Sequence, residues 1–238
     1  MRARRLLAVV VLVALVGAAC GGDEGGGERG SDRTAAPRGA DESPIGSSGT
    51  VADAALDLPL RVFIVDWAGG GPRSSARTVT EVERILDRVG EIWAPAGIAF
   101  DPLAVERLAV ERDALDALAH GDISAFAESA PPKSIRATEG SLVGFYASRI
   151  GGPNGVTASG APAFFVTDEP TVHDERVSAH EIGHILGLEH VPPVNRLMAS
   201  GVNGMQLAEN EIATARATAE SILEFFDEQG TDGRGGAP

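Results

Sequence analysis

The sequence predicts an α+β domain built on a twisted mixed sheet of about four or five strands, with two long helices and a further C-terminal helix. Two observations lead to this fold class. Short apolar runs typical of buried strands alternate with longer segments whose apolar residues recur at helical spacing. An early order of strand, helix and strand also implies a crossover and a parallel pair. We expect the first helix and a helix near residue 180 on one side of the sheet, and a smaller C-terminal part that completes a cleft.

The chain divides into four segments where its composition changes. Residues 1–20 form a basic and then apolar leader, and residues 21–57 are rich in Gly, Ser, Pro and charged residues. The second segment has too few large apolar residues to offset the entropy lost on ordering, so it is predicted to be a disordered linker. Residues 58–229 have ordinary globular composition and form the predicted domain, and residues 230–238 form a flexible tail.

The leader has the order of an export signal. Three arginines (Arg2, Arg4 and Arg5) precede an apolar run, Leu6–Val16, and small residues lead to Cys20, the only cysteine in the chain. The stretch resembles a bacterial lipoprotein signal, which implies lipidation of Cys20 and an outward-facing membrane anchor. Ordinary cleavage before Cys20 would instead give a secreted protein. A single cysteine also excludes a disulfide within the chain.

The charge of the chain excludes one class of partner. The formal net charge is -14 at pH 7. A protein that binds nucleic acid through a basic face usually has a positive net charge. We therefore expect no nucleic-acid partner.

The first elements of the domain follow from local signals. Leu60–Val65 is β-branched and apolar, which is typical of a strand. Thr78 and Glu81 form a predicted capping box, and apolar residues from Val82 to Trp93 recur at helical spacing. This helix should end before Pro95, and Gly97–Phe100 should be the second strand.

The remaining elements are less uniform. Residues 103–130 fit either a strand followed by a short helix or one helix. Leu142–Tyr146 and Ala163–Val166 are predicted strands, and the Gly151–Gly160 stretch between them is either a loop or a glycine-rich edge strand. Apolar residues at helical spacing in Ile212–Phe226 predict the C-terminal helix.

Three histidines carry the clearest chemical signal. His180 and His184 lie four residues apart, so on a helix both imidazoles project from one side and can bind one metal ion. Gly187 can adopt a left-handed conformation and end that helix, which lets the chain turn back and bring in His190 as a third ligand. Three nitrogen ligands leave a position open for water, as in catalytic zinc sites. Glu181 is placed to take the proton of that water as it attacks a peptide carbonyl.

These residues also carry a resemblance to a known family. The pattern HExxHxxGxxH, matched from His180 to His190, resembles that of the metzincin clan of zinc endopeptidases. Met198, eight residues after His190, occupies the place of the clan's Met-turn, and its spacing is most similar to that of the matrixins. The residue after His190 is Val191, where many matrixins have serine. The resemblance implies a metzincin-like catalytic domain, one catalytic Zn²⁺ and a protein or peptide substrate.

The resemblance also places a substrate-binding edge strand just before the strand at residues 163–166. An unpaired strand edge can bind an extended peptide through its backbone groups. The residues assigned to this edge are Gly155, Val156, Thr157 and Ala158.

Two questions stay open at this point. A non-catalytic surface lipoprotein that binds zinc and captures a protein partner would use the same histidines, although it would not need Glu181. A structural calcium ion is also open, because Asp168, Glu169 and Asp174 are close in sequence but form no convincing acidic loop.

Overall fold

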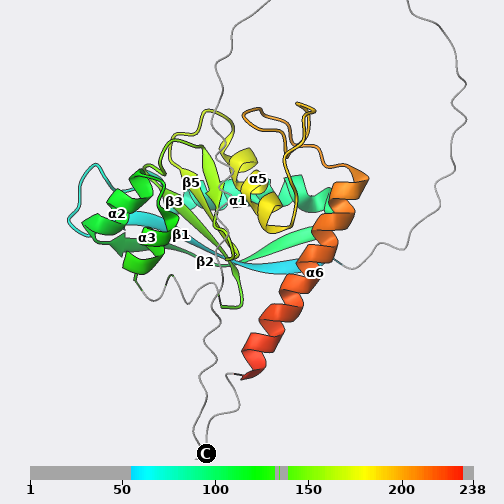
Figure 1. Cartoon of the computed structure of the whole chain (residues 1–238), viewed down its shortest axis with the longest axis horizontal. Helices are drawn as coiled ribbons and strands as arrows, with labels where there is room; N and C mark the ends of the chain where they lie inside the picture. Colours follow the sequence, from blue (N-terminus) through cyan, green and yellow to red (C-terminus); the bar gives the residue numbers. More distant parts are fainter. Residues whose placement is uncertain (1–54, 132–133, 135–138, 233–238) are drawn as a thin grey trace, which may run out of the picture.

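The computed structural model describes residues 55–131, 134 and 139–232 (Figure 1). The predicted signal with Cys20, the linker up to residue 54 and the last six residues of the tail lie outside the described residues. The first strand begins at Leu56 and the last helix ends at Asp232, so each extends slightly beyond the predicted domain limits. No helix among the described residues has the length and apolar character needed to cross a membrane.

Five strands form one mixed sheet in the order β2-β1-β3-β5-β4. The pairs β2–β1, β1–β3 and β3–β5 are parallel, and β4 pairs antiparallel with β5 at the edge. The α+β class, the mixed sheet and the parallel pairing of the first two strands are therefore confirmed. The strands are β1 (Leu56–Trp67), β2 (Ile98–Val110), β3 (Leu142–Ala147), β4 (Gly155–Thr157) and β5 (Ala163–Thr167).

The helices begin largely where the sequence signals place them. Thr78 caps α1 through a capping box, in which Thr78 Oγ1 accepts from the Glu81 backbone N–H and Glu81 Oε2 accepts from the Thr78 backbone N–H. A short 3₁₀ turn containing Pro95 follows α1, whose hydrogen-bond pattern proline cannot continue because it has no backbone N–H. The helices are α1 (Val79–Trp93), α2 (Arg112–Ala119), α3 (Ile123–Ser129), α5 (Asp174–Ile185) and α6 (Glu209–Asp232).

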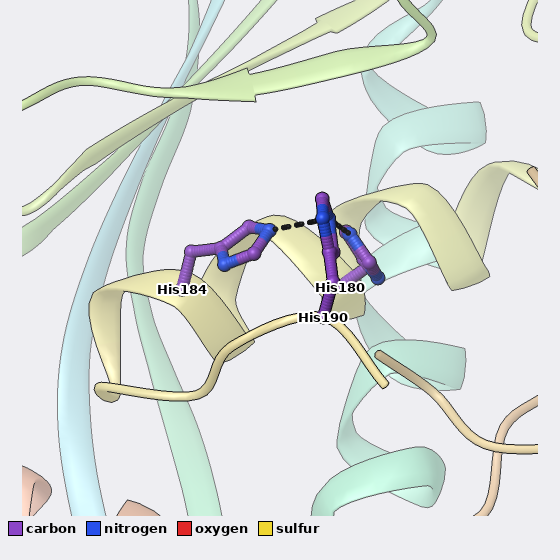
Figure 2. A group of neighbouring side chains, drawn as sticks. All are labelled: His180, His184 and His190. Atoms are coloured by element: carbon purple, nitrogen blue, oxygen red, sulfur yellow. Dashed lines mark hydrogen bonds between the residues drawn. The ribbon is translucent and has the colours of Figure 1, made fainter. Parts of the chain in front are cut away.

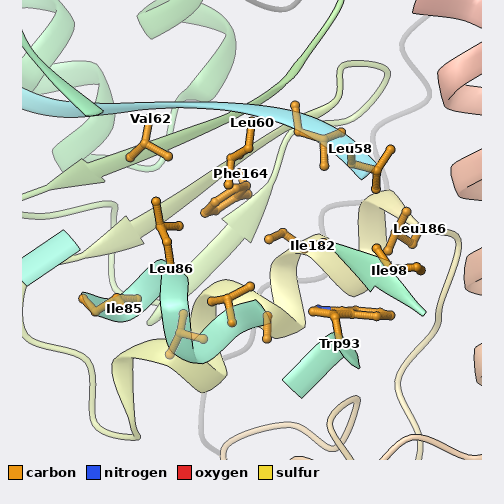
Figure 3. Packing of buried hydrophobic residues seen from close by; sticks show 14 of the residues in the cluster. Leu58, Leu60, Val62, Ile85, Leu86, Trp93, Ile98, Phe164, Ile182 and Leu186 are labelled. Atoms are coloured by element: carbon orange, nitrogen blue, oxygen red, sulfur yellow. The ribbon is translucent and has the colours of Figure 1, made fainter. Parts of the chain in front are cut away.

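Helices cover both faces of the sheet. Alternate residues of β1 point to opposite sides, as the strand geometry dictates. Leu58, Leu60 and Val62 join the core under α1 and α5 (Figure 3), whereas Phe63 and Val65 join a second core with α2 and α3. The expected placement of the first helix and the helix near residue 180 on one side is confirmed, and α2 and α3 add a layer on the other (Figure 1).

The structure decides both of the open secondary-structure alternatives. Within residues 103–130 there is a strand followed by helices, and β2 runs without a break from Ile98 to Val110 instead of ending at Phe100. Pairing with the whole length of β1 explains this extension. The 151–160 stretch contains the three-residue edge strand β4 between turns. Ala158 lies just beyond β4 and still donates its N–H to the Ala163 carbonyl at 2.8 Å.

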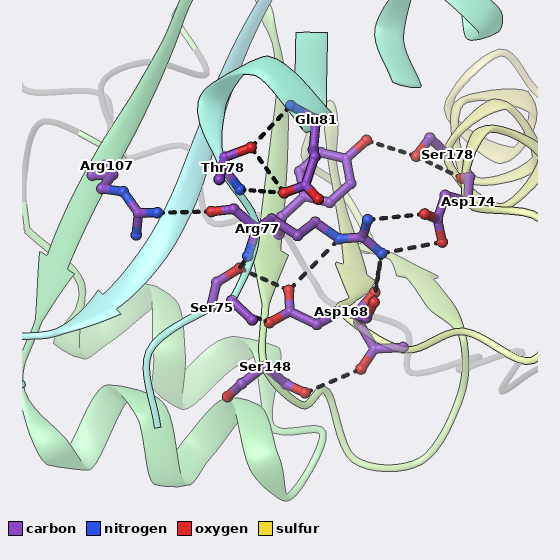
Figure 4. Close-up of polar contacts among 12 residues, drawn as sticks. Ser75, Arg77, Thr78, Glu81, Arg107, Ser148, Asp168, Asp174 and Ser178 are labelled. Carbon is purple, nitrogen blue, oxygen red and sulfur yellow. Dashed lines mark hydrogen bonds and ion pairs between the residues drawn. The ribbon is translucent and has the colours of Figure 1, made fainter. Parts of the chain in front are cut away.

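A buried arginine joins the segment before α1 to the start of α5 (Figure 4). Arg77 Nη1 donates to Asp174 Oδ2 at 2.9 Å, and its Nη2 donates to the Asp168 carbonyl at 2.6 Å. The guanidinium also lies 5.6 Å from the centre of the Tyr146 ring. The Asp168 carboxylate accepts from Ser75 and from the backbone N–H of residue 76. Two of the three acidic residues considered for calcium therefore serve this hydrogen-bonded network.

Candidate active site

Helix α5 and the turn after it bring the predicted site residues together. Helix α5 carries His180, Glu181 and His184 and ends at Ile185. Gly187 has a φ of 79°, a left-handed conformation that glycine adopts without strain and that reverses the chain toward His190.

The three imidazoles converge on one point (Figure 2). Nε2 of His190 lies 3.1 Å from Nε2 of His180 and 3.1 Å from Nε2 of His184. The candidate ligand atoms of the three rings all lie within 4.8 Å of one another. Among the described residues, this is the group of side chains arranged to hold a metal ion.

Backbone carbonyls determine which ring nitrogens face that point. His180 Nδ1 lies 2.8 Å from the Leu197 carbonyl, and His184 Nδ1 lies 2.9 Å from the Leu188 carbonyl. A carbonyl only accepts hydrogen bonds, so both Nδ1 atoms carry the proton and both Nε2 atoms present lone pairs. Because a neutral His190 has one ring proton, at least one of the two contacts at 3.1 Å brings together two nitrogens with no proton between them.

The electrostatics of the rings favour a metal ion over a proton at this point. Burial lowers the pKa of His180 to about 3 and also lowers the pKa of His184 and of His190. The rings are therefore neutral at physiological pH, which is the form that binds metal. Three neutral imidazoles, two of them with the second nitrogen hydrogen-bonded to a backbone carbonyl, fit one Zn²⁺ ion with a coordination position to spare.

Glu181 is the buried carboxyl group beside these ligands. The residue is 3% exposed. Burial raises its pKa to about 7, while the hydroxyl of Thr157 and the charge of Arg176 act in the opposite direction. A carboxyl group with a pKa near neutrality can accept and return a proton, as a general base must.

The turn that contains Met198 lies against the ligand helix. The Ala199 N–H donates to the Arg196 carbonyl at 3.2 Å and closes a tight turn around Met198, which is fully buried. A Cβ atom added to Gly183 of α5 would lie 2.5 Å from Met198 Sδ. Arg176, one helical turn before His180, donates through Nη2 to the carbonyls of this turn at positions 197 and 199.

An apolar cavity of about 500 Å³ opens beside Glu181 and His184. The segment from Val156 to Pro162 lines it, and so do Ile222, Phe225 and Phe226 of α6. Apart from Glu181 and His184, no charged or titratable side chain of the described chain lines it.

The residues predicted for the substrate edge take different positions around Glu181. Gly155 and Thr157 face α5 and approach Glu181 directly. Val156 and Ala158 pack against the second core on the other face, and both also line the cavity. Sequence reasoning placed all four residues near the site, but it missed the contacts of Thr157 and of Arg176, which join residues 24 and 21 positions apart.

Comparisons with known proteins add fold likenesses at low identity. No protein-family model matches the chain, and no curated protein matches it. The solved structures that align with it include metalloproteinase-II from Bacteroides fragilis, with a TM-score of 0.47, 15% identity and coverage of 70% of this chain and 55% of that chain. This chain thus spans about half the length of that protein.

Two archaeal structures align over nearly their whole length. Archaemetzincin from Methanopyrus kandleri has a TM-score of 0.44 and 14% identity, with coverage of 71% of this chain and 99% of that chain. A zinc-dependent peptidase from Methanocorpusculum labreanum has a TM-score of 0.40 and 12% identity, with coverage of 67% and 99%. Likenesses at these values do not assign a function, which rests here on the three histidines and their surroundings.

Proposed function

We propose that the protein is a zinc-dependent endopeptidase of the metzincin type, with matrixin-like spacing of its Met-turn, that hydrolyses proteins or peptides. One observation carries the proposal. Three neutral imidazoles converge beside a buried carboxyl group at the mouth of an apolar cavity. Binding zinc alone requires the imidazoles, whereas hydrolysis also requires a base and a place for the substrate.

Each residue has a defined task in this proposal. His180, His184 and His190 would hold the ion. Bound zinc supplies a Lewis acid that polarises the substrate carbonyl and lowers the pKa of water at the site to about 7. Glu181 takes a proton from the attacking water, and it returns that proton to the amine that leaves when the C–N bond breaks.

The surroundings of the site support an extended substrate. The outer side of β4 is an edge of the sheet, so its backbone groups can pair with a peptide. The cavity has walls of aliphatic and aromatic side chains, including Ile222 and Phe225. A large apolar side chain next to the cleaved bond would bury its surface there, and we propose this preference for the enzyme.

The decisive experiment compares two variants on α5, one that removes the proposed base and one that removes a metal ligand. Glu181→Gln keeps the size of the side chain and removes the base, so the variant should retain about one equivalent of zinc while cleavage of a peptide library falls by at least roughly 10²-fold. His184→Ala should lose zinc and cleavage together. The measurements are metal content and turnover, with a chelator-treated parent as the control.

The alternative hypothesis, a non-catalytic zinc-binding lipoprotein, makes a different prediction for the parent and the two variants. A non-catalytic lipoprotein that captures a partner would bind zinc through the three histidines and cleave nothing. If the zinc-loaded parent leaves a broad peptide library intact, or if Glu181→Gln cleaves as fast as the parent, the peptidase proposal is wrong.

We also propose that the protein acts outside the cytoplasm, held at the membrane by a lipid on Cys20. The support is the order of basic, apolar and small residues before the single cysteine. Mass spectrometry of the mature N-terminus from a membrane extract tests this proposal. An unmodified cysteine, or mature protein found only in the medium, would contradict it.

A further inference from the structure

Thr157 makes two contacts with Glu181, the residue proposed as the base. Its Oγ1 lies 2.8 Å from Glu181 Oε2 and 2.8 Å from the Glu181 backbone carbonyl. The hydroxyl has one proton, which it can donate to either acceptor. The two contacts together define the position of the side-chain oxygen relative to the backbone of α5.

Gly155, on the same face of β4 as Thr157, restricts the other carboxylate oxygen of Glu181. Residues two apart on a strand point to the same face, so Gly155 and Thr157 both face α5. A Cβ atom added to Gly155 would lie 2.7 Å from Glu181 Cγ and 2.7 Å from Glu181 Oε1. Oε1 therefore lies against the backbone of Gly155, while Oε2 lies against the hydroxyl of Thr157.

The strand that makes these contacts is itself held in place. Thr157 pairs with Phe164 of β5, and the next residue donates its N–H to the Ala163 carbonyl at 2.8 Å. The Phe164 side chain is fully buried in the main core. A side chain on this strand therefore has little freedom to move away from α5.

We propose that Thr157 is a positioning residue that holds the Glu181 carboxylate in the orientation required for proton transfer. The inference rests on the proposed peptidase function. A base must lie within hydrogen-bond reach of the proton that it takes, and a displacement of about 1 Å can reduce the rate by about 10²-fold. Thr157 would act before and during the chemical step through Glu181, without touching the zinc ion.

The position of Thr157 has a second consequence for substrate binding. The inner face of β4 contacts Glu181, and the outer edge of the same strand is the proposed partner of the substrate backbone. A peptide that pairs with β4 would therefore bind to the element that aligns the base.

The test uses Thr157→Val, which removes the hydroxyl at nearly constant shape, and Thr157→Ser, which restores it. For Thr157→Val we expect kcat to fall by about 10- to 100-fold, KM to change by less than about threefold and zinc content to stay at one equivalent. Thr157→Ser should recover kcat to within about threefold of the parent. Thr214→Val is the matched control, because the Thr214 hydroxyl donates to a backbone carbonyl within α6 and should leave kcat unchanged.

A double-mutant cycle supplies a measurement that does not depend on activity. Glu181→Ala removes the carboxylate and leaves the backbone carbonyl that Thr157 also contacts. Thr157→Val should lower the folding equilibrium constant about tenfold more in the parent than in the Glu181→Ala background, with zinc in equal excess throughout. Equal effects in the two backgrounds would show that the hydroxyl has no energetic contact with the carboxylate.

The outcomes separate the two proposals. If the parent cleaves peptides and Thr157→Val keeps its kcat, the positioning role is wrong and the peptidase proposal stands. If Thr157→Val and Thr157→Ser lose kcat equally, the effect is structural and the role of the hydroxyl is also overturned. If the parent cleaves nothing, the peptidase proposal fails and the positioning role fails with it, whereas the cycle still measures the contact itself.

Discussion

Gly183 and Gly90 offer a matched test of how closely the Met-turn lies against the ligand helix. Both glycines are inside helices, Gly183 in α5 and Gly90 in α1, and neither has a positive φ. Alanine at either position gains about 0.5–1 kcal/mol from the lower entropy of the unfolded chain and better helix propensity. The difference between the two variants therefore reports the space around each new methyl group.

The structure predicts opposite signs for the two substitutions. A Cβ atom at Gly90 meets nothing within 4 Å, so Gly90→Ala should stabilise the protein by about 0.5–1 kcal/mol. At Gly183 the new atom would lie 2.5 Å from Sδ of Met198, which is fully buried. Overpacking costs about 1–3 kcal/mol, and the helix gain offsets part of this, so Gly183→Ala should lose about 1–2 kcal/mol.

Thermal unfolding of the zinc-loaded variants measures this difference. For a domain of this size, about 1 kcal/mol corresponds to a change in Tm of about 2–4 °C. We expect Tm to rise by about 1–4 °C for Gly90→Ala and to fall by about 2–8 °C for Gly183→Ala. In a Met198→Ala background, which lacks the clashing side chain, Gly183→Ala should no longer lower Tm. If Gly183→Ala is as stable as Gly90→Ala, the close contact between α5 and the Met-turn does not constrain the protein, and the reasoning is refuted.

Three further predictions concern the same site. Arg176→Met should lower the unfolding free energy by about 1–3 kcal/mol in denaturant titrations, because it leaves the buried carbonyl at position 199 without its donor and removes one of the two donors to the carbonyl at position 197, which keeps His180 Nδ1; the exposed Arg88→Met is the control, expected within about 0.5 kcal/mol of the parent. In chelator-treated protein, burial raises the pKa of Glu181 from its ordinary 4.5 to about 7, so its ionisation destabilises the fold progressively as pH rises from 4.5 through 7. Glu181→Gln should then be more stable than the parent by on the order of 3 kcal/mol at pH 8 and about equal at pH 4, and a difference independent of pH would contradict this. Finally, zinc at about 100 times its Kd should stabilise the parent by about 2.7 kcal/mol in thermal unfolding, and His184→Ala should show no such gain.

The features that were predictable from the sequence depend on short-range spacing. His180 and His184 share a helix face because they are four residues apart, and the Thr78 capping box joins residues three apart. Gly187 lies three residues after His184 and three before His190, so its position indicates the turn that brings in the third ligand. In each case the relevant geometry is contained in one turn of helix, so the local pattern is sufficient.

Other features depend on contacts that leave no local pattern. Arg77 joins residues about 90 positions away, and a lone arginine in a sequence does not indicate burial. The length of strand β2 was not predictable because it is an edge strand with an exposed middle, residues 101–103, which contains Pro102, a residue that edge strands tolerate. The role assigned to Thr157 follows from the strand order, because only the sheet places β4 over α5.

The two edges of the sheet also bear on how the protein behaves in concentrated solution. Exposed strand edges can add a strand from another molecule and lead to aggregation. Strand β4 is three residues long, which leaves few backbone groups for a second sheet to join. Strand β2 is longer but contains Pro102 and a register irregularity opposite Leu60 and Arg61, which bends the edge and interrupts the ladder. One edge can thus accept a short peptide strand, while neither offers the long flat surface on which self-association of sheets depends.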